Sequence, residues 1–425
     1  MLRMLCRQRN PFIVLVLLLA PWAGGLELWS DDERGSRGDL DVAGKVTSLA
    51  SNAPSDPILF PDDFSRTTLT RLRLGLDVRH NDWLDSELAY EQRARWLSGG
   101  TGLGAGGSVL PAEAKAPFRL TQLDWEITAD DDSSYRHEID RGLVALHPEW
   151  GDVTLGRQAI GLGRGTLFSA VDVFSPFSPL EVDREWRRGV DAFRAEYRLS
   201  TTSSAETITA FGETWEQSAW LGRFRGYLGD IDGSLIFGKR AEDFMVGATF
   251  SAIVGEAEVH GELALFDTPE AQPDSTLWGG DRLATKLVLG SSYTFNVGNG
   301  LTLLGEYHYS DFGVKDAEDA LMRLQDSDFQ KRYLRGDTQI LGREAIAAQL
   351  SYPFNEAVNG GFLVLTNPTD GSGVVSPSLR LDLDRNLTLT TNLFVPWGAE
   401  PKNGQLRSEY GASPVSFFVQ AAVYY

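Results

Sequence analysis

Charged side chains are concentrated in one stretch of the sequence, residues 161–188, where carboxylates alternate with guanidinium groups. Aromatic side chains such as Phe177 and Trp186 lie between these charges, so the stretch should pack against other parts of the protein rather than extend into solvent. It shows no helix or strand periodicity, and so long a connection in a compact domain is usually functional. The candidate site combines this stretch with polar residues at its ends: Arg157, Gln158, Asp172, Glu181, Asp183, Arg184, Glu185, Arg187, Arg188 and Asp191.

A second set of charges has the spacing of alternate residues on neighbouring strands. Opposed rows of such charges across a pore create a transverse field that orients polar solutes and filters ions. An alternative of equal weight is that these charges pair with one another and only keep an interior wet. The set comprises Arg71, Arg73, Asp77, Glu87, Glu91 and Arg93.

Other patterns that would carry chemistry are weak. The five histidines are scattered without the spacing of metal ligands, and the glycine-rich residues 161–165 lack the spacing of a dinucleotide-binding loop. An enzymatic site could involve His260 or His308, but no nucleophile motif accompanies either of them. The sequence therefore predicts no cofactor, no metal and no enzymatic activity.

The first 23 residues have the pattern of a secretory signal peptide. Arg3, Arg7 and Arg9 precede a short apolar core at residues 12–20, which is too short to span a membrane. Removing this segment would remove the single cysteine, Cys6, and would change the formal net charge from −20 to −23. An exported, acidic chain without cysteines excludes disulfides and argues against nucleic-acid partners.

Strict alternation of side chains is the main structural signal in the remaining sequence. In residues 301–310, Leu303 and Tyr307 face one way while Glu306 and His308 face the other, and charges recur on the second face of other segments. Membrane barrels show this period with lipid outside and water inside, whereas a soluble sandwich would use the apolar face as its core. Short and long connections also alternate along the chain, as they do in bacterial barrels. Together these patterns predict an all-β, antiparallel transmembrane barrel of about 18 strands (16–18).

The expected organisation has four parts. Residues 1–23 form the signal peptide, residues 24–38 a periplasmic lead-in, and residues 39–425 the outer-membrane barrel, with residues 161–188 as an inward-folded constriction loop. Residues 98–134 are expected to form one extracellular excursion, and residues 316–325 a short helix in an outer loop. The last strand, residues 414–425, ends in an aromatic residue and resembles the insertion signal of outer-membrane barrels, which the barrel-assembly machinery reads.

The sequence GDVTLGRQ at residues 151–158, followed by a long loop, resembles the strand before the constriction loop of bacterial general porins. The longer run at residues 156–192 is similar to poorly characterised porin-like barrels and, more loosely, to alginate-export-type barrels that accompany exopolysaccharide genes. Leu162 and Gly163 stand where a Trp-Gly pair is expected in those relatives. The resemblance implies an outer-membrane channel in a Gram-negative cell.

The leading interpretation is a passive channel for small polar or charged solutes, narrowed by residues 161–188. The alternatives are a dedicated export barrel for a secreted polysaccharide, or a barrel sheath around an electron-carrying cytochrome. A third interpretation is an outer-membrane enzyme. The expected partners are outer-membrane lipid and lipopolysaccharide, with a polysaccharide or a periplasmic export or cytochrome partner under the alternatives.

Overall fold

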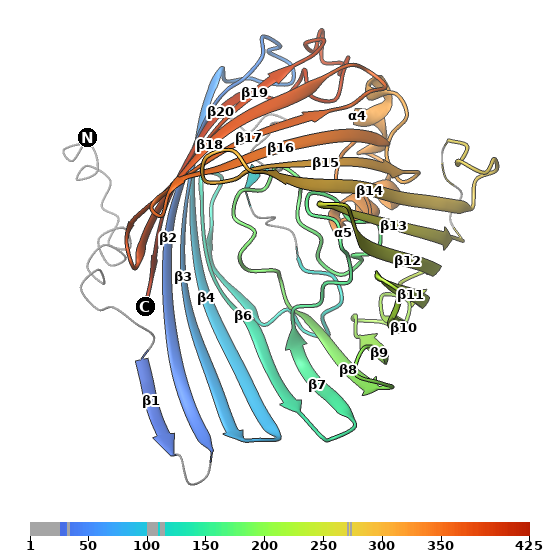
Figure 1. The fold of residues 1–425 in the computed structure, drawn as a ribbon. Coiled ribbons are helices and arrows are strands. Elements are labelled where there is room, and N and C mark those ends of the chain that lie inside the picture. Colours follow the sequence, from blue (N-terminus) through green and yellow to red (C-terminus); the bar gives the residue numbers. More distant parts are fainter. Residues whose placement is uncertain (1–25, 32–34, 100–108, 111–114, 270–271, 273) are drawn as a thin grey trace.

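The computed structural model describes residues 26–31, 35–99, 109–110, 115–269, 272 and 274–425. The predicted signal peptide, residues 1–23, lies outside these described residues. Eighteen antiparallel strands form a closed barrel around a central space (Figure 1). The prediction of an all-β barrel of about 18 strands is therefore confirmed.

The barrel strands follow one another in chain order, and β2 pairs with β20 to close the wall. This closing pair runs from Ala43 opposite Tyr424 to Asn52 opposite Val415 and is antiparallel, as an even number of strands requires. The barrel strands are β2 (Ser36–Asn52), β3 (Phe64–Asn81), β4 (Leu84–Ser98), β6 (Ser133–Leu146), β7 (Gly151–Gln158), β8 (Val190–Arg198), β9 (Ser204–Ala210), β10 (Ala219–Leu228), β11 (Ile231–Arg240), β12 (Asp243–Val254), β13 (Ala257–Asp267), β14 (Leu283–Phe295), β15 (Leu301–Ser310), β16 (Glu344–Asn355), β17 (Val358–Thr366), β18 (Gly373–Asp384), β19 (Leu387–Trp397) and β20 (Val415–Tyr424).

Two further strands lie beside the barrel and correct the predicted boundaries. The predicted lead-in, residues 24–38, contains β1 (Leu26–Asp31), which pairs with the start of β2, so β2 begins at Ser36 rather than at residue 39. The predicted excursion at residues 98–134 contains β5 (Asp124–Ala129), which pairs with β6. Strand β1 pairs with residues of β2 that lie beyond its pairing with β20. Strand β5 likewise pairs with residues of β6 that lie beyond its pairing with β7.

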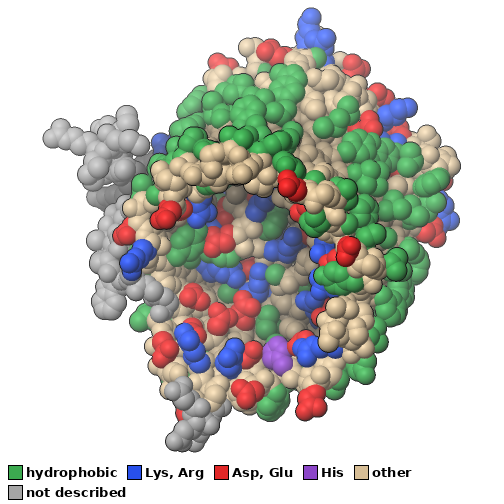
Figure 2. Space-filling model, in the orientation of Figure 1, with side chains coloured by type: hydrophobic (Ala, Val, Ile, Leu, Met, Phe, Trp, Pro, Cys, Tyr) green, Lys and Arg blue, Asp and Glu red, His purple; other side chains and the backbone are tan. Residues whose placement is uncertain are grey.

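Alternation along each strand separates an outer face from an inner face. On β11, Leu235 is 61% exposed and Ile236 is fully buried. Apolar side chains such as Phe224, Phe244 and Phe250 cover the outer surface, where they would contact lipid, as the hydrophobic surface in Figure 2 shows.

Three helical segments of the described residues lie in the connection between β15 and β16. The predicted helix at residues 316–325 is present as η1 (Ala317–Asp319) and α4 (Ala320–Arg323), and α5 (Ser327–Arg335) follows it. Asp326 begins α5 by accepting hydrogen bonds from the N–H groups of the first turn, and Gly336 ends it in the left-handed region. No helix of the described chain is long and apolar enough to cross a membrane.

Candidate functional site: an inward loop inside the barrel

The connection between β7 and β8, residues 159–189, folds into the barrel (Figure 1). We call it the inward loop. It starts and ends on adjacent strands, yet its hydrogen bonds reach β13 and β15 on one side and β2, β3 and β20 on the other. The inward fold expected for residues 161–188 is therefore present.

Glu262 on β13 holds the first part of the inward loop. Glu262 is 2% exposed, and both of its carboxylate oxygens accept hydrogen bonds from the loop. A carboxylate surrounded by backbone N–H donors makes strong, charge-assisted hydrogen bonds. The donors are the N–H groups of Arg164, Gly165, Ala170 and Val171 and the hydroxyl of Ser169.

Glu306 on β15 holds the adjoining turn in the same way. It accepts hydrogen bonds from the N–H groups of Thr166 (2.6 Å), Leu167 (2.9 Å) and Phe168 (3.0 Å). His260 Nε2 lies 3.0 Å from the same carboxylate. Glu262 and Glu306 thus fasten the inward loop to the wall, and His260, a candidate for an enzymatic site in the sequence, contacts Glu306.

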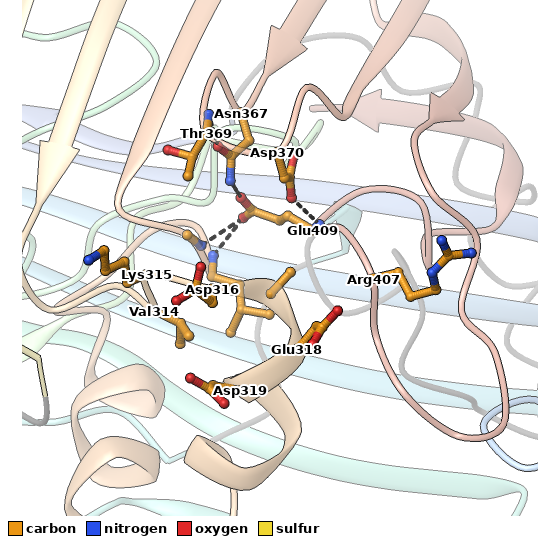
Figure 3. A pocket seen from close by; sticks show the side chains of 13 residues that line it. Val314, Lys315, Asp316, Glu318, Asp319, Asn367, Thr369, Asp370, Arg407 and Glu409 are labelled. Atoms are coloured by element: carbon orange, nitrogen blue, oxygen red, sulfur yellow. Dashed lines mark hydrogen bonds between the residues drawn. The ribbon is translucent and has the colours of Figure 1, made fainter.

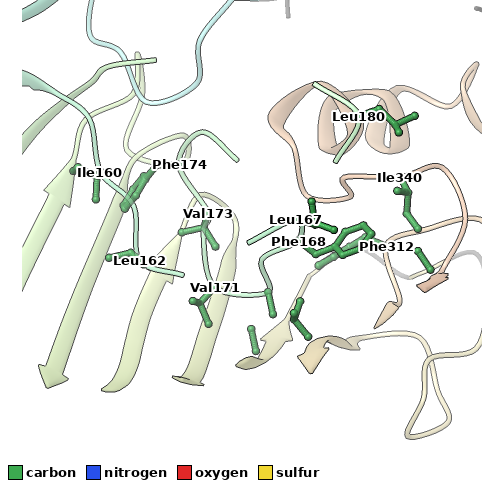
Figure 4. Close-up of a cluster of buried hydrophobic side chains, with 14 of the residues drawn as sticks. Ile160, Leu162, Leu167, Phe168, Val171, Val173, Phe174, Leu180, Phe312 and Ile340 are labelled. Carbon is green, nitrogen blue, oxygen red and sulfur yellow. The ribbon is translucent and has the colours of Figure 1, made fainter. Parts of the chain in front are cut away.

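The first half of the inward loop is apolar and packs on an apolar part of the inner wall (Figure 4). Phe168 stacks on His308 of β15, with ring centroids 4.8 Å apart. The apolar contacts of the loop fill part of one side of the barrel interior, and buried charged side chains of the same strands, such as Glu262 and Lys286, lie on the inner face as the sequence pattern predicted. The core joins Ile160, Leu162, Phe168, Val171 and Phe174 of the loop to Ile208, Leu221, Ile236, Met245, Phe266 and Val288 of β9–β14.

The second half of the inward loop contacts the opposite wall through charges. Lys45 Nζ on β2 lies 2.7 Å from Asp183, 2.6 Å from Glu185 and 3.8 Å from the ring centre of Trp186. Asp183 also accepts a hydrogen bond from Arg71 (3.1 Å), and Glu185 accepts one from the Tyr424 hydroxyl (2.7 Å). Burial alone would raise the pKa of Asp183, but Arg71 and Lys45 lower it, so this carboxylate stays charged.

A network of arginines and carboxylates continues along the wall beside this contact. Glu91 accepts two hydrogen bonds from Arg71 (2.9 and 3.0 Å), and Arg73 lies 3.0 Å from Asp140. Arg119 joins Asp140 (3.2 Å) and the backbone oxygen of Gly189 at the end of the loop (2.8 Å). Strand β6 carries a bulge here, because Ala89 pairs with Arg141 whereas Tyr90 pairs with Ile139.

Other predicted residues of the loop bind within the loop. Arg187 pairs with Asp172, whose pKa is raised by burial. Arg184 donates to the backbone oxygens of Thr166 (2.9 Å), Ser178 (2.8 Å) and Pro179 (2.7 Å), which holds the loop in its compact shape.

The remaining predicted residues lie at the edges of the site. Arg157 pairs with Asp191 (2.7 Å) and shares the outer face with Leu155, which is 57% exposed. Arg157 also donates to the backbone oxygens of Gln122 (2.9 Å) and Ile139 (2.8 Å), so it fastens the segment before β5 to the wall. Gln158 donates to the backbone oxygen of Ala192 (3.1 Å), and Asp77 opposes Glu87 across β3 and β4, away from the loop.

A cavity of about 860 Å³ lies between the inward loop, the long strands β2–β4 and the outer connections. Burial raises the pKa of Glu181 and of Glu409, which both line it, to about 7. Figure 2 shows Lys, Arg, Asp and Glu side chains gathered inside the hollow of the barrel. The basic residues that line this cavity are Arg71, Arg93, Arg95, Arg188 and Arg335, and its acidic rim includes Asp62, Asp130, Asp131 and Asp132.

A smaller hollow of about 430 Å³ lies in the outer connections (Figure 3). Glu409 forms its floor and accepts hydrogen bonds from the N–H groups of Leu341 (2.8 Å) and Gly342 (3.0 Å) and from Asn367 (2.8 Å). These hydrogen bonds of Glu409 thus connect three loops, which precede β16, β18 and β20. No group of three or more potential metal ligands occurs among the residues that the structure describes.

Several residues that build the site were absent from the predicted set. Lys45, Glu262 and Glu306 lie on the inner face of their strands, and alternation was the signal that could have identified them. Arg119 lies in an irregular segment, and Gln339 follows α5, so neither carried a sequence signal of its role.

No protein-family model and no curated protein matches the sequence. Solved structures do resemble the fold. OccAB4 of Acinetobacter baumannii is 10% identical, with a TM-score of 0.55 over 91% of this chain and 98% of that chain. OccAB1 of the same organism is 9% identical (TM-score 0.55, 91% and 96%), and OccAB2 is 10% identical (TM-score 0.52, 91% and 98%). At these identities the likeness shows that the chain has the fold of outer-membrane porins.

Proposed function

We propose that the protein is an outer-membrane channel through which small polar or charged solutes pass beside the inward loop. The observation that supports this proposal is the division of the barrel interior. The apolar half of the loop fills part of the side along β9–β14, and the charged half faces β2, β3 and β20. A route for polar solutes is therefore expected along the charged side, where Arg71, Arg93 and Arg188 line the cavity.

The inward loop sets the width of this route. Its two ends belong to adjacent strands, whereas its contacts with Glu262 and Lys45 lie on different parts of the wall, so it extends across the interior. The basic side chains around Trp186 are expected to favour anions along this route. Lys45, Arg71 and Arg73 lie 3.8, 4.8 and 5.2 Å from the centre of its ring.

The proposal includes the surroundings of the barrel. Apolar side chains on the outer face would contact outer-membrane lipid and lipopolysaccharide, and β20, with Phe417 and Val419 on that face, would carry the signal for barrel assembly. A polysaccharide-export barrel or a cytochrome sheath would require a wide interior, and the apolar core between the loop and β9–β14 argues against both.

Liposome swelling tests the proposal. Liposomes that contain the refolded protein should swell in small anionic and neutral solutes, and a variant that lacks residues 168–188 should admit larger solutes. Equal swelling of protein-containing and empty liposomes, with the barrel shown to be folded by its heat-shifted gel mobility, would contradict the channel.

A further inference from the structure

The segment that follows α5 touches the inward loop directly. The Gln339 side chain accepts a hydrogen bond from the N–H of Ser169 (2.8 Å) and donates one to the backbone oxygen of Phe177 (2.8 Å). One side chain of an outer connection therefore joins two points of the loop that are separated by its apolar core residues.

The end of α5 is in steric contact with the loop. Gly336 ends the helix with φ of 84°, and a Cβ atom built on it would lie 2.8 Å from Cγ of Pro176. There is no room for a methyl group between the helix end and the loop. The end of α5 and this part of the loop are therefore packed directly against each other.

Arg240 at the end of β11 connects the same two elements through charge. Its guanidinium pairs with Asp337, directly after α5, and donates to the backbone oxygen of Val173 in the loop (3.4 Å). Asp337 also accepts from Arg335 (2.6 Å), and both carboxylate and guanidinium of the Arg240 pair are buried. Removing one member of such a buried ion pair leaves the other charge buried without its partner, which strongly lowers stability.

Helix α5 is also fastened to the rim of the barrel and lines the cavity. Arg332 binds Asp243 (2.9 and 3.0 Å), and Arg335 binds Glu242 (2.8 and 2.9 Å). Tyr333 on the same helix lines the cavity together with residues of the inward loop. The helix is thus attached to the wall through its arginines and touches the loop at its C-terminal end.

We propose that α5 is a lid coupled to the inward loop, so that the part of the loop from Ser169 to Phe177 leaves its position only when α5 lifts. A change on the outer side of the barrel would then alter the width of the route inside it. This consequence rests on the proposed channel function, whereas the coupling itself does not.

Thiol labelling of the loop tests the coupling without requiring conduction. The chain beginning at residue 24 contains no cysteine, so Val173→Cys places one buried reporter in the loop. Gly336→Ala forces a methyl group against Pro176, and Gln339→Ala removes two hydrogen bonds. The matched control is Gly371→Ala, which has a similar φ of 70° but meets nothing within 4 Å.

In the refolded barrel, Gly336→Ala and Gln339→Ala should each speed labelling of the reporter about tenfold, the first because the added methyl group pushes the loop away from the helix end and the second because two hydrogen bonds to the loop are lost. Gly371→Ala should leave the rate unchanged, and all variants should keep the heat-shifted gel mobility of the parent. Unchanged labelling in both test variants, or equally faster labelling in the control, would overturn the coupling. Faster labelling in a barrel that conducts no ions would support the coupling and contradict the channel.

Discussion

Replacing Glu262 should release the inward loop from the wall without unfolding the barrel. The carboxylate accepts hydrogen bonds from Gly165 N (2.7 Å), Ser169 Oγ (2.7 Å), Ala170 N (2.6 Å) and Val171 N (3.2 Å). Glu262→Gln keeps the size of the side chain but removes its charge and replaces one acceptor by an NH₂ group that faces N–H donors.

The size of the effect follows from these contacts. A hydrogen bond to a charged group contributes about 1.5–3 kcal/mol, and a buried donor without a partner costs about 1–3 kcal/mol. Even where water replaces some of the lost partners, the attached state of the loop should be destabilised by at least ~3 kcal/mol relative to the detached state. This changes the ratio of attached to detached loop by more than a hundredfold. The barrel strands keep their backbone hydrogen bonds in this variant, so the loop should detach before the barrel unfolds.

Single-channel recording measures the release. Glu262→Gln should show larger and noisier current steps than the parent, because the loop no longer holds one position. The control is Glu258→Gln on the same strand, whose exposed carboxylate accepts hydrogen bonds from the hydroxyls of Ser251 (3.4 Å) and Ser292 (3.3 Å) and not from the inward loop among the described residues. Currents of Glu262→Gln that match those of the parent in size and noise would refute this account of how the loop is held.

Three further predictions follow from charges around the cavity. Lys45→Met leaves Asp183 and Glu185 without their 2.7 and 2.6 Å partner, so the zero-current potential in a salt gradient should shift toward cations, and an unshifted potential would contradict the role of Lys45. Because burial raises the pKa of Glu181 and Glu409 to about 7, both carboxylates take up protons as the pH falls through neutrality, which should increase the preference for anions. The double variant Glu181→Gln and Glu409→Gln should lose this pH dependence. Because both pKa values are raised in the folded protein, the contribution of these two groups to the free energy of unfolding is present at low pH and is lost as the pH rises through about 7. Arg119→Ala leaves buried Glu138 and Asp140 with one partner fewer, so the barrel should be destabilised by about 3–5 kcal/mol and lose its heat-shifted gel mobility at a lower temperature than the parent.

The architecture could be predicted because each strand carries its own signal. Alternation assigns Leu303 and Glu306 to opposite faces from a few neighbouring residues, and the short turns that separate strands are local features as well. The inward loop could be located because its length and its charges are properties of one continuous stretch. These predictions needed no knowledge of contacts between distant residues.

The contacts of the loop could not be predicted, because they join residues far apart in the sequence. Lys45 meets Asp183 across 138 positions, and neither residue type indicates the other. The bulge at β6, which brings Asp140 and the adjacent Arg141 into one network, changes the register in a way that alternation does not reveal. Inner-face residues Ile236 and Met245 are apolar because the loop covers them, whereas an uncovered inner face would be polar.

Helix α5 was missed for a different reason. Its sequence, SDFQKRYLR, is short and mostly polar: Phe329 and Tyr333 stack on one face, whereas Arg332 and Arg335 attach the helix to the barrel through ion pairs. The signals that were present are its ends, with Asp326 as the capping residue and Gly336 as the terminating glycine.

The measurement that tests the central claim most directly is the ion conductance of the intact refolded protein in a planar bilayer. A charged route beside the inward loop predicts stable open steps, with a zero-current potential in a salt gradient that indicates preference for anions. A correctly folded barrel that carries no current under any applied voltage would contradict the claim that this protein is a channel.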